Sequence, residues 1–376
     1  MIDPANSSAS IGERLRMARS AAGLTQESAA ASVGMARTTI VAIERDQRRV
    51  KPDELVALAA AYQVSVGKLL APDAVHVDLN AKFRKVEGRQ QPQSVLHAIN
   101  LLKRLATGAV ELERAIGATL RQDYPPPIRL IPQGLTHQAE DAAIGLRNRL
   151  GIGLGKMGDL MSLLELDMGV RVFCRPLDDG SISGLYAFDS AIGACILVNA
   201  SHPWRRRLQT LAHETGHFVA DRFDADVLDE GASAPSIEER FARRFGQALL
   251  MPAPAIRARF EQALSASSSF EVRNLILLAH QFDVSVEAMC RRLEDLELLA
   301  RGTWESLRER GFGLKTEREV IGDNHSQMSP ASVSPRLACL AAKALADATL
   351  SEGQLCEMLV IDRVELRQSI AVFKAD

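Results

Sequence analysis

The sequence predicts a multidomain, mainly α-helical protein with an N-terminal five-helix bundle, a central α+β domain that holds a short sheet, and a small C-terminal helical unit. Apolar residues recur at helical spacing between residues 11 and 70, which predicts the bundle. Three β-like runs separated by polar turns lie between residues 170 and 198. The expected boundaries are 1–72 for the bundle, 73–135 for a helical linker with a proline-rich segment, 136–300 for the α+β domain, 301–335 for a second linker and 336–376 for the C-terminal unit.

The individual elements follow from the same periodicities and from turn residues. The expected strands are Val170–Cys174, Ile182–Phe188 and Cys195–Val198. Beyond the bundle, helices are expected at 93–120, 137–149, 157–167, 203–222, 236–250, 271–281 and 285–299. Thr25 and Ser351 are the expected N-caps of their helices.

Composition narrows the class of protein. A chain of 376 residues is too long for one ordinary core, and 47% hydrophobic with 24% charged residues is typical of globular proteins. The formal net charge of −2 argues neither for nor against nucleic acid, since a basic face can lie within a neutral total. Five cysteines without a C-x-x-C pair argue against a disulfide framework. Because no signal-peptide core and no long apolar run is found, we expect a cytoplasmic protein without a membrane partner.

Residues 24–44 have the layout of a helix-turn-helix. A short helix begins after Thr25, Gly34 permits the turn, and a second helix follows. Three side chains at the start of that second helix are the candidates for base contacts in a major groove: Arg37, Thr38 and Thr39.

Other polar residues of the bundle suit contacts to the DNA backbone. Gln26 lies at a helix N-terminus, where phosphate groups are favoured. A basic cluster follows the second helix and contains Arg45, Arg48, Arg49 and Lys51. The alternative is a protein-binding bundle whose arginines form a solvated face.

The bundle resembles the Xre/Cro-type repressor domain. The resemblance rests on the segments IGERLRMAR, GLTQESAAASVGMARTTIVAIE and ELVALAAAYQVSVGKLL. It implies a homodimer that binds a palindromic operator in double-stranded DNA. Asp46 departs from the pattern, which has glycine there, but aspartate adopts the left-handed conformation more readily than most residues.

The central domain contains the motif His213-Glu214-Thr215-Gly216-His217. On a helix, side chains four residues apart project from one face, so the two imidazoles can bind one Zn²⁺. Glu214 can then act as the general base on a zinc-activated water. The alternative is a helix face with two polar histidines and a solvated glutamate.

A catalytic zinc needs a third protein ligand and one open position. The next predicted helix offers Glu238 and Glu239 near its start, and spacing does not choose between them. Acidic residues also favour the first turn of any helix, whether or not they bind a metal. His202 and His280 lie outside the motif helix and are poorer candidates.

Residues from about 136 to 300 resemble the ImmA/IrrE family of metallopeptidases. The segments that carry the resemblance are NASHPWRRRLQTLAHETGHFVADR, EERFARRFGQALLMPAPAI and SFEVRNLILLAHQFDVSVEAMCRRLEDLELL. The resemblance implies a zincin-like fold and makes Glu239 the third ligand. Two residues depart from the family pattern: Thr215 replaces a leucine within the motif, and Arg243 replaces an asparagine on the following helix.

These expectations combine into a DNA-binding transcriptional regulator with zinc-dependent endopeptidase activity. The resemblance implies a protein substrate, a repressor or other regulator in the control of stress, phage or mobile-element genes. Two alternatives remain open at this stage. The metallopeptidase-like domain could sense a metal or ligand without proteolysis, or the chain could be a toxin–antitoxin-type fusion.

One further motif and the cysteines are set aside. Residues 153–158 match G-x-G-x-x-G, but a helical run precedes them where a dinucleotide site would need a strand. Cys174 and Cys195 fall in predicted strands and are expected to be inert core residues.

Overall fold

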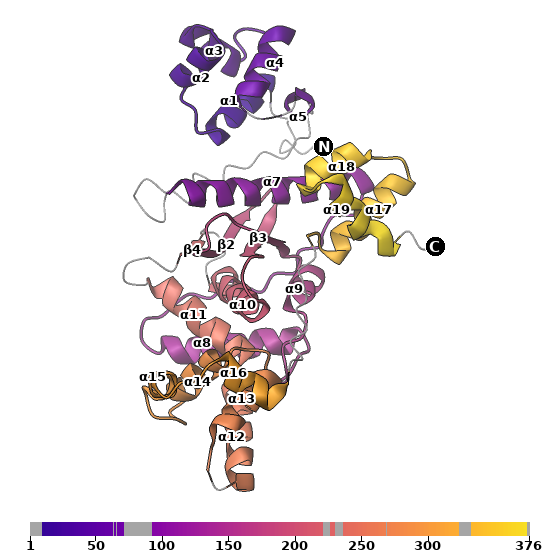
Figure 1. Ribbon diagram of the computed structural model, residues 1–376. Coiled ribbons are helices and arrows are strands. Elements are labelled where there is room, and N and C mark those ends of the chain that lie inside the picture. Colours follow the sequence, from indigo (N-terminus) through magenta and orange to yellow (C-terminus); the bar gives the residue numbers. More distant parts are fainter. Residues whose placement is uncertain are drawn as a thin grey trace.

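The computed structural model describes residues 10–62, 64, 66–70, 92–220, 226–229, 236–267, 269–322 and 332–373. The fold is mostly helical and contains one four-stranded sheet (Figure 1). Across the described ranges, no helix combines the length and the hydropathy that a membrane crossing requires.

The N-terminal bundle has the five expected helices around a core of its own. They are α1 (Ile11–Ala21), α2 (Gln26–Ser32), α3 (Arg37–Glu44), α4 (Pro52–Ala61) and α5 (Val66–Leu70). Thr25 is the N-cap of α2, as predicted, because its hydroxyl accepts from the Ser28 backbone N–H. Asp46 has a φ of 57°, and its Oδ1 accepts from the Gly12 N–H at 3.0 Å. The aspartate therefore fits the left-handed position and also links the end of α3 to α1.

The sheet is built from three predicted strands and a fourth that the sequence analysis missed. Its strands are β1 (Arg171–Arg175), β2 (Ile182–Asp189), β3 (Gly193–Asn199) and β4 (Asp226–Asp229), in the order β1-β3-β2-β4. β1 runs parallel to β3, whereas β2 is antiparallel to both β3 and β4. Alternate residues of β3 enter two different cores, because successive side chains point to opposite faces of a sheet.

One face of the sheet carries α10 and the helices that pack below it (Figure 1). The helices of this core are α8 (Leu135–Arg149), α9 (Leu160–Leu163), α10 (Trp204–Ala220), α11 (Ile237–Leu250), α12 (Ala253–Ser267), α13 (Val272–Gln281) and α14 (Val286–Asp295). A short π-helix, Leu164–Met168, leads from α9 into β1. Except for α12, these helices match runs that the sequence analysis expected, within a few residues.

The opposite face of the sheet carries α7 and the C-terminal helices. They are α7 (Gln93–Ile116), α17 (Pro335–Ala346), α18 (Glu352–Leu359) and α19 (Arg363–Ile370). Ser351 is the N-cap of α18, as predicted. The C-terminal helices pack against one end of α7 (Figure 1). The 93–120 helix and the C-terminal unit, expected to be separate from the α+β domain, therefore share a core with its sheet.

The segment 301–335 differs from the linker that the sequence analysis expected. It contains α15 (Thr303–Glu309) and α16 (Leu314–Ile321), and Trp304 and Leu307 are buried in the core beneath α10. Isolated apolar residues in a polar stretch gave too weak a periodicity to predict these short helices.

Two loops are held by partly buried hydrogen bonds. The proline-rich segment has no helix or strand, and the Tyr124 hydroxyl donates to the Gly169 carbonyl at 3.1 Å and accepts from the Ala194 N–H at 3.0 Å. The glycine motif follows α8, and the buried Arg147 guanidinium donates to the carbonyls of Gly153 and Gly155. The glycine-containing loop thus binds the Arg147 side chain through its carbonyl groups, and it follows a helix where a dinucleotide site would need a strand.

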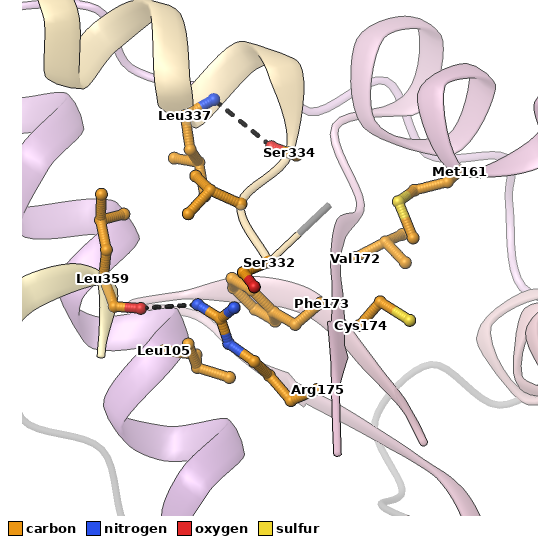
Figure 2. Close-up of a pocket in the computed structure, with 11 residues that line it drawn as sticks. Leu105, Met161, Val172, Phe173, Cys174, Arg175, Ser332, Ser334, Leu337 and Leu359 are labelled. Carbon is orange, nitrogen blue, oxygen red and sulfur yellow. Dashed lines mark hydrogen bonds between the residues drawn. The ribbon is translucent and has the colours of Figure 1, made fainter. Parts of the chain in front are cut away.

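A small cavity lies where β1, α7 and the C-terminal helices meet (Figure 2). Its volume is about 10 Å³, which is room for one water molecule and no larger ligand. The Arg175 guanidinium extends into this junction and donates to the Leu359 carbonyl at 2.8 Å.

A buried ion-pair network beside this cavity joins the C-terminal helices to the rest of the domain. Arg336 of α17 lies 2.9 Å from Glu113 of α7 and 3.7 Å from Glu165 of the π-helix. Glu113 also pairs with Arg171 of β1. Burial raises the pKa of Glu165, while the Ser334 hydroxyl and the Arg336 charge oppose that rise.

Replacing Arg336 with methionine should destabilise the protein by about 3 kcal/mol, since two buried carboxylates would lose a compensating charge. Lys343→Met is the matched control, because Lys343 lies exposed on the same helix, and its effect should stay within about 0.5 kcal/mol. Denaturant unfolding followed by circular dichroism measures both changes. Equal effects of the two substitutions would show that the network does not hold the C-terminal helices.

Candidate metal centre and DNA-binding surface

The two histidines of the motif lie one helical turn apart on α10, on the side that faces α11. Both are buried, and their Nε2 atoms are 3.1 Å apart. The acid comes from the first turn of α11, where the Ser236 hydroxyl accepts from the Glu239 N–H at 3.1 Å. Glu239 Oε2 lies 3.1 Å from His213 Nε2 and 3.5 Å from His217 Nε2.

Two glycines allow the helices to approach closely enough for this geometry. A Cβ at Gly216 would lie 2.7 Å from the Ala242 Cα, and one at Gly246 would lie 3.0 Å from the His213 backbone nitrogen. The backbones of α10 and α11 therefore meet at His213 and again at Gly216, just before His217. As a result, a side chain as short as glutamate reaches both imidazoles.

The three side chains fit a zinc ion. Ligand atoms about 2 Å from a tetrahedral zinc ion lie about 3.3 Å apart, and the three separations here are 3.1, 3.1 and 3.5 Å. Among the described residues, His213, His217 and Glu239 are the one such group of potential ligand atoms. Two imidazoles and one carboxylate are a donor set of catalytic zinc sites, which keep a fourth position open.

Arg243 contacts Oε1 of Glu239, the carboxylate oxygen that does not face the histidines. Its Nη2 lies 3.3 Å from Glu239 Oε1, so the two oxygens of Glu239 face different partners. Burial on its own would raise the pKa of Glu239, but the hydrogen bonds and charges of the two histidines outweigh it and hold the pKa well below its usual range. The carboxylate is therefore ionised, as a metal ligand must be.

Glu214 lies beside the ligands without being one of the group. Its side chain is fully buried. Its carboxylate lies against β2, where a Cβ on Gly184 would be 2.9 Å from Glu214 Oε1. The strand thus leaves room for the carboxylate between the sheet and α10, next to the first histidine.

The remaining candidates of the sequence analysis are placed elsewhere. Glu238, the alternative third ligand, does not join the group of ligand atoms. His202 bonds to the Gly180 carbonyl at 2.9 Å. The Thr215 hydroxyl donates to the Leu211 carbonyl of its own helix at 2.7 Å, so this residue does not take part in the group of candidate ligands.

Cys174 and Cys195 are buried, as expected of core residues. Burial raises the pKa of the Cys195 thiol to about 12 and raises that of Cys174. A thiolate nucleophile at either position is therefore disfavoured near neutral pH.

The candidate base-reading residues share the start of α3. Arg37 and Thr38 are exposed, and Thr39 is half-buried. The Arg37 side chain is 62% exposed, and its Nε lies 3.9 Å from Glu27, which is a weak contact that DNA could displace.

Two of the predicted phosphate contacts are engaged within the protein. The Gln26 amide donates to Glu44 Oε2 at 2.9 Å, and Glu44 also pairs with Arg19. Arg48 lies 2.7 Å from Glu54. Arg45 and Arg49 are exposed, so they are better placed to meet a DNA backbone.

Comparison with known proteins agrees with both halves of this description. Residues 10–71 match the family model described as a helix-turn-helix domain, and residues 166–294 match the peptidase M78 model described as an IrrE N-terminal-like domain. The HTH-type transcriptional regulator ImmR of Bacillus subtilis (strain 168) is 39% identical over 66 residues, which are 18% of this chain and 52% of ImmR. The chain thus covers about half the length of this curated relative.

Metal content should depend on the three proposed ligands. Purified wild-type protein should hold about one Zn²⁺ per chain, and His213→Ala or His217→Ala should abolish binding. Glu239→Ala should weaken zinc binding far more than Glu238→Ala, the matched control on the same turn. Elemental analysis after dialysis measures the zinc content. Equal zinc content in all variants would contradict the proposed site.

DNA binding should separate base contacts from backbone contacts. In the full chain, Arg37→Ala should reduce the discrimination between operator and random DNA, whereas Arg49→Ala should weaken both alike. Affinity should fall steeply with salt, because binding releases counterions from the phosphates. Fluorescence anisotropy with promoter and random duplexes measures both effects. Binding that is absent or insensitive to salt would favour a protein-binding bundle.

Proposed function

We propose that this chain, which matches a helix-turn-helix family model and an IrrE N-terminal-like family model, is a transcriptional regulator that cleaves another regulatory protein by zinc-dependent hydrolysis. The observation that carries the proposal is the position of Glu214. Its buried carboxylate belongs to the residue that follows His213, and His213, His217 and Glu239 could hold the metal without it, so Glu214 is not needed as a ligand. General-base catalysis is the function that such a carboxylate serves in peptidases with this motif.

The steps follow from the residues around the centre. His213, His217 and Glu239 would hold the zinc ion and leave one position open. Bound zinc would activate a water and polarise the peptide carbonyl. Glu214 would accept a proton from the attacking water and pass it to the leaving amine, so that one carboxylate serves both proton transfers.

The helix-turn-helix domain would bring this activity to an operator. Xre-type bundles bind DNA as homodimers, and the exposed face of α3 supports the same use here. A repressor bound near that operator is the substrate that this arrangement favours. The described cysteines are all free, which agrees with a cytoplasmic place of action.

Glu214→Gln tests the proposal, because it preserves the shape of the side chain and removes its basicity. The variant should keep zinc and DNA binding and should lose about 10²–10⁴-fold in cleavage rate. Digestion of a proteome-derived peptide library, followed by mass spectrometry, measures the rate without knowledge of the natural target. Glu238→Gln, at a residue that is not part of the candidate ligand group, should cleave like the wild type.

The outcome also separates an enzyme from a sensor. Two results together would contradict the peptidase function: the wild type cleaves nothing in the library, and a Glu214→Gln strain regulates transcription normally. They would instead support a domain that senses a metal or ligand.

A further inference from the structure

A hollow lined by arginines opens next to the candidate metal centre. Its volume is about 690 Å³, and it lies between α11, α14 and the start of α15. Its four arginines are Arg243, Arg244, Arg291 and Arg301. A surface hollow with this many guanidinium groups suits a ligand that carries carboxylates or phosphates.

Two of the three acids that line the hollow form ion pairs or hydrogen bonds within the protein. Arg291 lies 2.7 Å from Glu305 and 3.9 Å from Glu294. Glu294 also accepts from the Trp304 backbone N–H at 3.0 Å. Arg291 is therefore paired with two of the acids that line the hollow, Glu294 and Glu305.

Arg244 and Arg301 also line the hollow. Among the residues that the structure describes, no acid forms an ion pair with Arg244 or Arg301. Asp295 is the remaining acid of the lining, against Arg244 and Arg301, because Arg243 contacts Glu239. Over the whole lining, four arginines face the three acids Glu294, Asp295 and Glu305, so the formal charge of the lining is +1.

Arg243 lines the hollow and also contacts the candidate metal centre. The Arg243 guanidinium contacts Glu239 Oε1, while Glu239 Oε2 faces the two histidines. Along α11, Arg243 is about 6 Å beyond Glu239 and Gln247 about 12 Å beyond it. An extended peptide bound along α11 would advance about 3.3 Å per residue, so these distances would correspond to two to four residues from the scissile bond.

We propose that this hollow is a substrate subsite that selects an aspartate or glutamate side chain two to four residues from the cleaved bond. The inference rests on the proposed peptidase function and adds the substrate class. Guanidinium groups bind carboxylates through paired, charge-assisted hydrogen bonds, which gives both orientation and selectivity. The arginine that replaces the family's asparagine in α11 is thus the residue that joins the subsite to the metal centre.

The test uses the zinc-loaded full chain and the double variant Arg244→Gln/Arg301→Gln. Arg243 is left intact, because it contacts a proposed metal ligand. In the peptide library, wild-type cleavage sites should be enriched in Asp and Glu two to four residues away, and the double variant should lose this enrichment. For one acidic peptide, kcat/KM should fall about 10-fold, as expected for two partly exposed charge contacts of about 3-fold each.

Two controls make the effect specific. The same peptide with its acidic residue replaced by glutamine should be cleaved at the same rate by the wild type and the double variant. Arg257→Gln changes an exposed arginine of α12 outside the hollow and should leave the selectivity unchanged.

A second readout does not need cleavage. Fluorescein-labelled hexaglutamate should bind the Glu214→Gln chain more tightly than hexaglutamine does, and the two arginine substitutions should remove the difference. If the wild type cleaves nothing while this binding holds, the peptidase function fails and the acidic-ligand site stands. Cleavage without acidic enrichment would overturn the subsite. Weaker binding of duplex DNA by the double variant, with peptide selectivity unchanged, would instead assign the hollow to a nucleic-acid backbone.

Discussion

The close crossing of α10 and α11 is the constraint on which the metal centre depends. Gly216 meets the backbone of Ala242, and Gly246 meets the backbone at His213. A side chain at either glycine would push the helices apart and move the Glu239 carboxylate away from both imidazoles. The histidine spacing provides two ligands on one helix, but the packing of small residues provides the third. The motif and the glycines therefore act as one unit.

The rest of the domain holds this crossing in place. The sheet packs on α10 from one side, and β2 contributes Gly184, which leaves room for the Glu214 carboxylate. On the far face of the sheet, α7 and the C-terminal helices close a second core, which the ion pairs of Arg336 connect to Glu113. The proposed catalytic carboxylate of Glu214 thus lies between α10 and a sheet that is covered on its other face as well.

Local signals in the sequence predicted the parts of the fold that depend on neighbouring residues. Thr25 and Ser351 cap the helices that they were expected to cap, and the five-helix bundle and three of the four strands lie where periodicity placed them. Contacts between distant residues could not be predicted in this way. Arg336 pairs with an acid more than 200 positions earlier in the chain, and the choice of Glu239 over Glu238 came from a family resemblance because both lie in one helical turn.

Crystallography with anomalous scattering at the zinc edge tests the central claim, that the helix crossing creates a zinc centre of the catalytic type. Protein crystallised with zinc should show one ion about 2 Å from Nε2 of each histidine and from Oε2 of Glu239, with the Glu214 carboxylate outside the coordination shell. An ion bound by Glu214 or Glu238 in place of Glu239, or no ion between α10 and α11, would contradict the account.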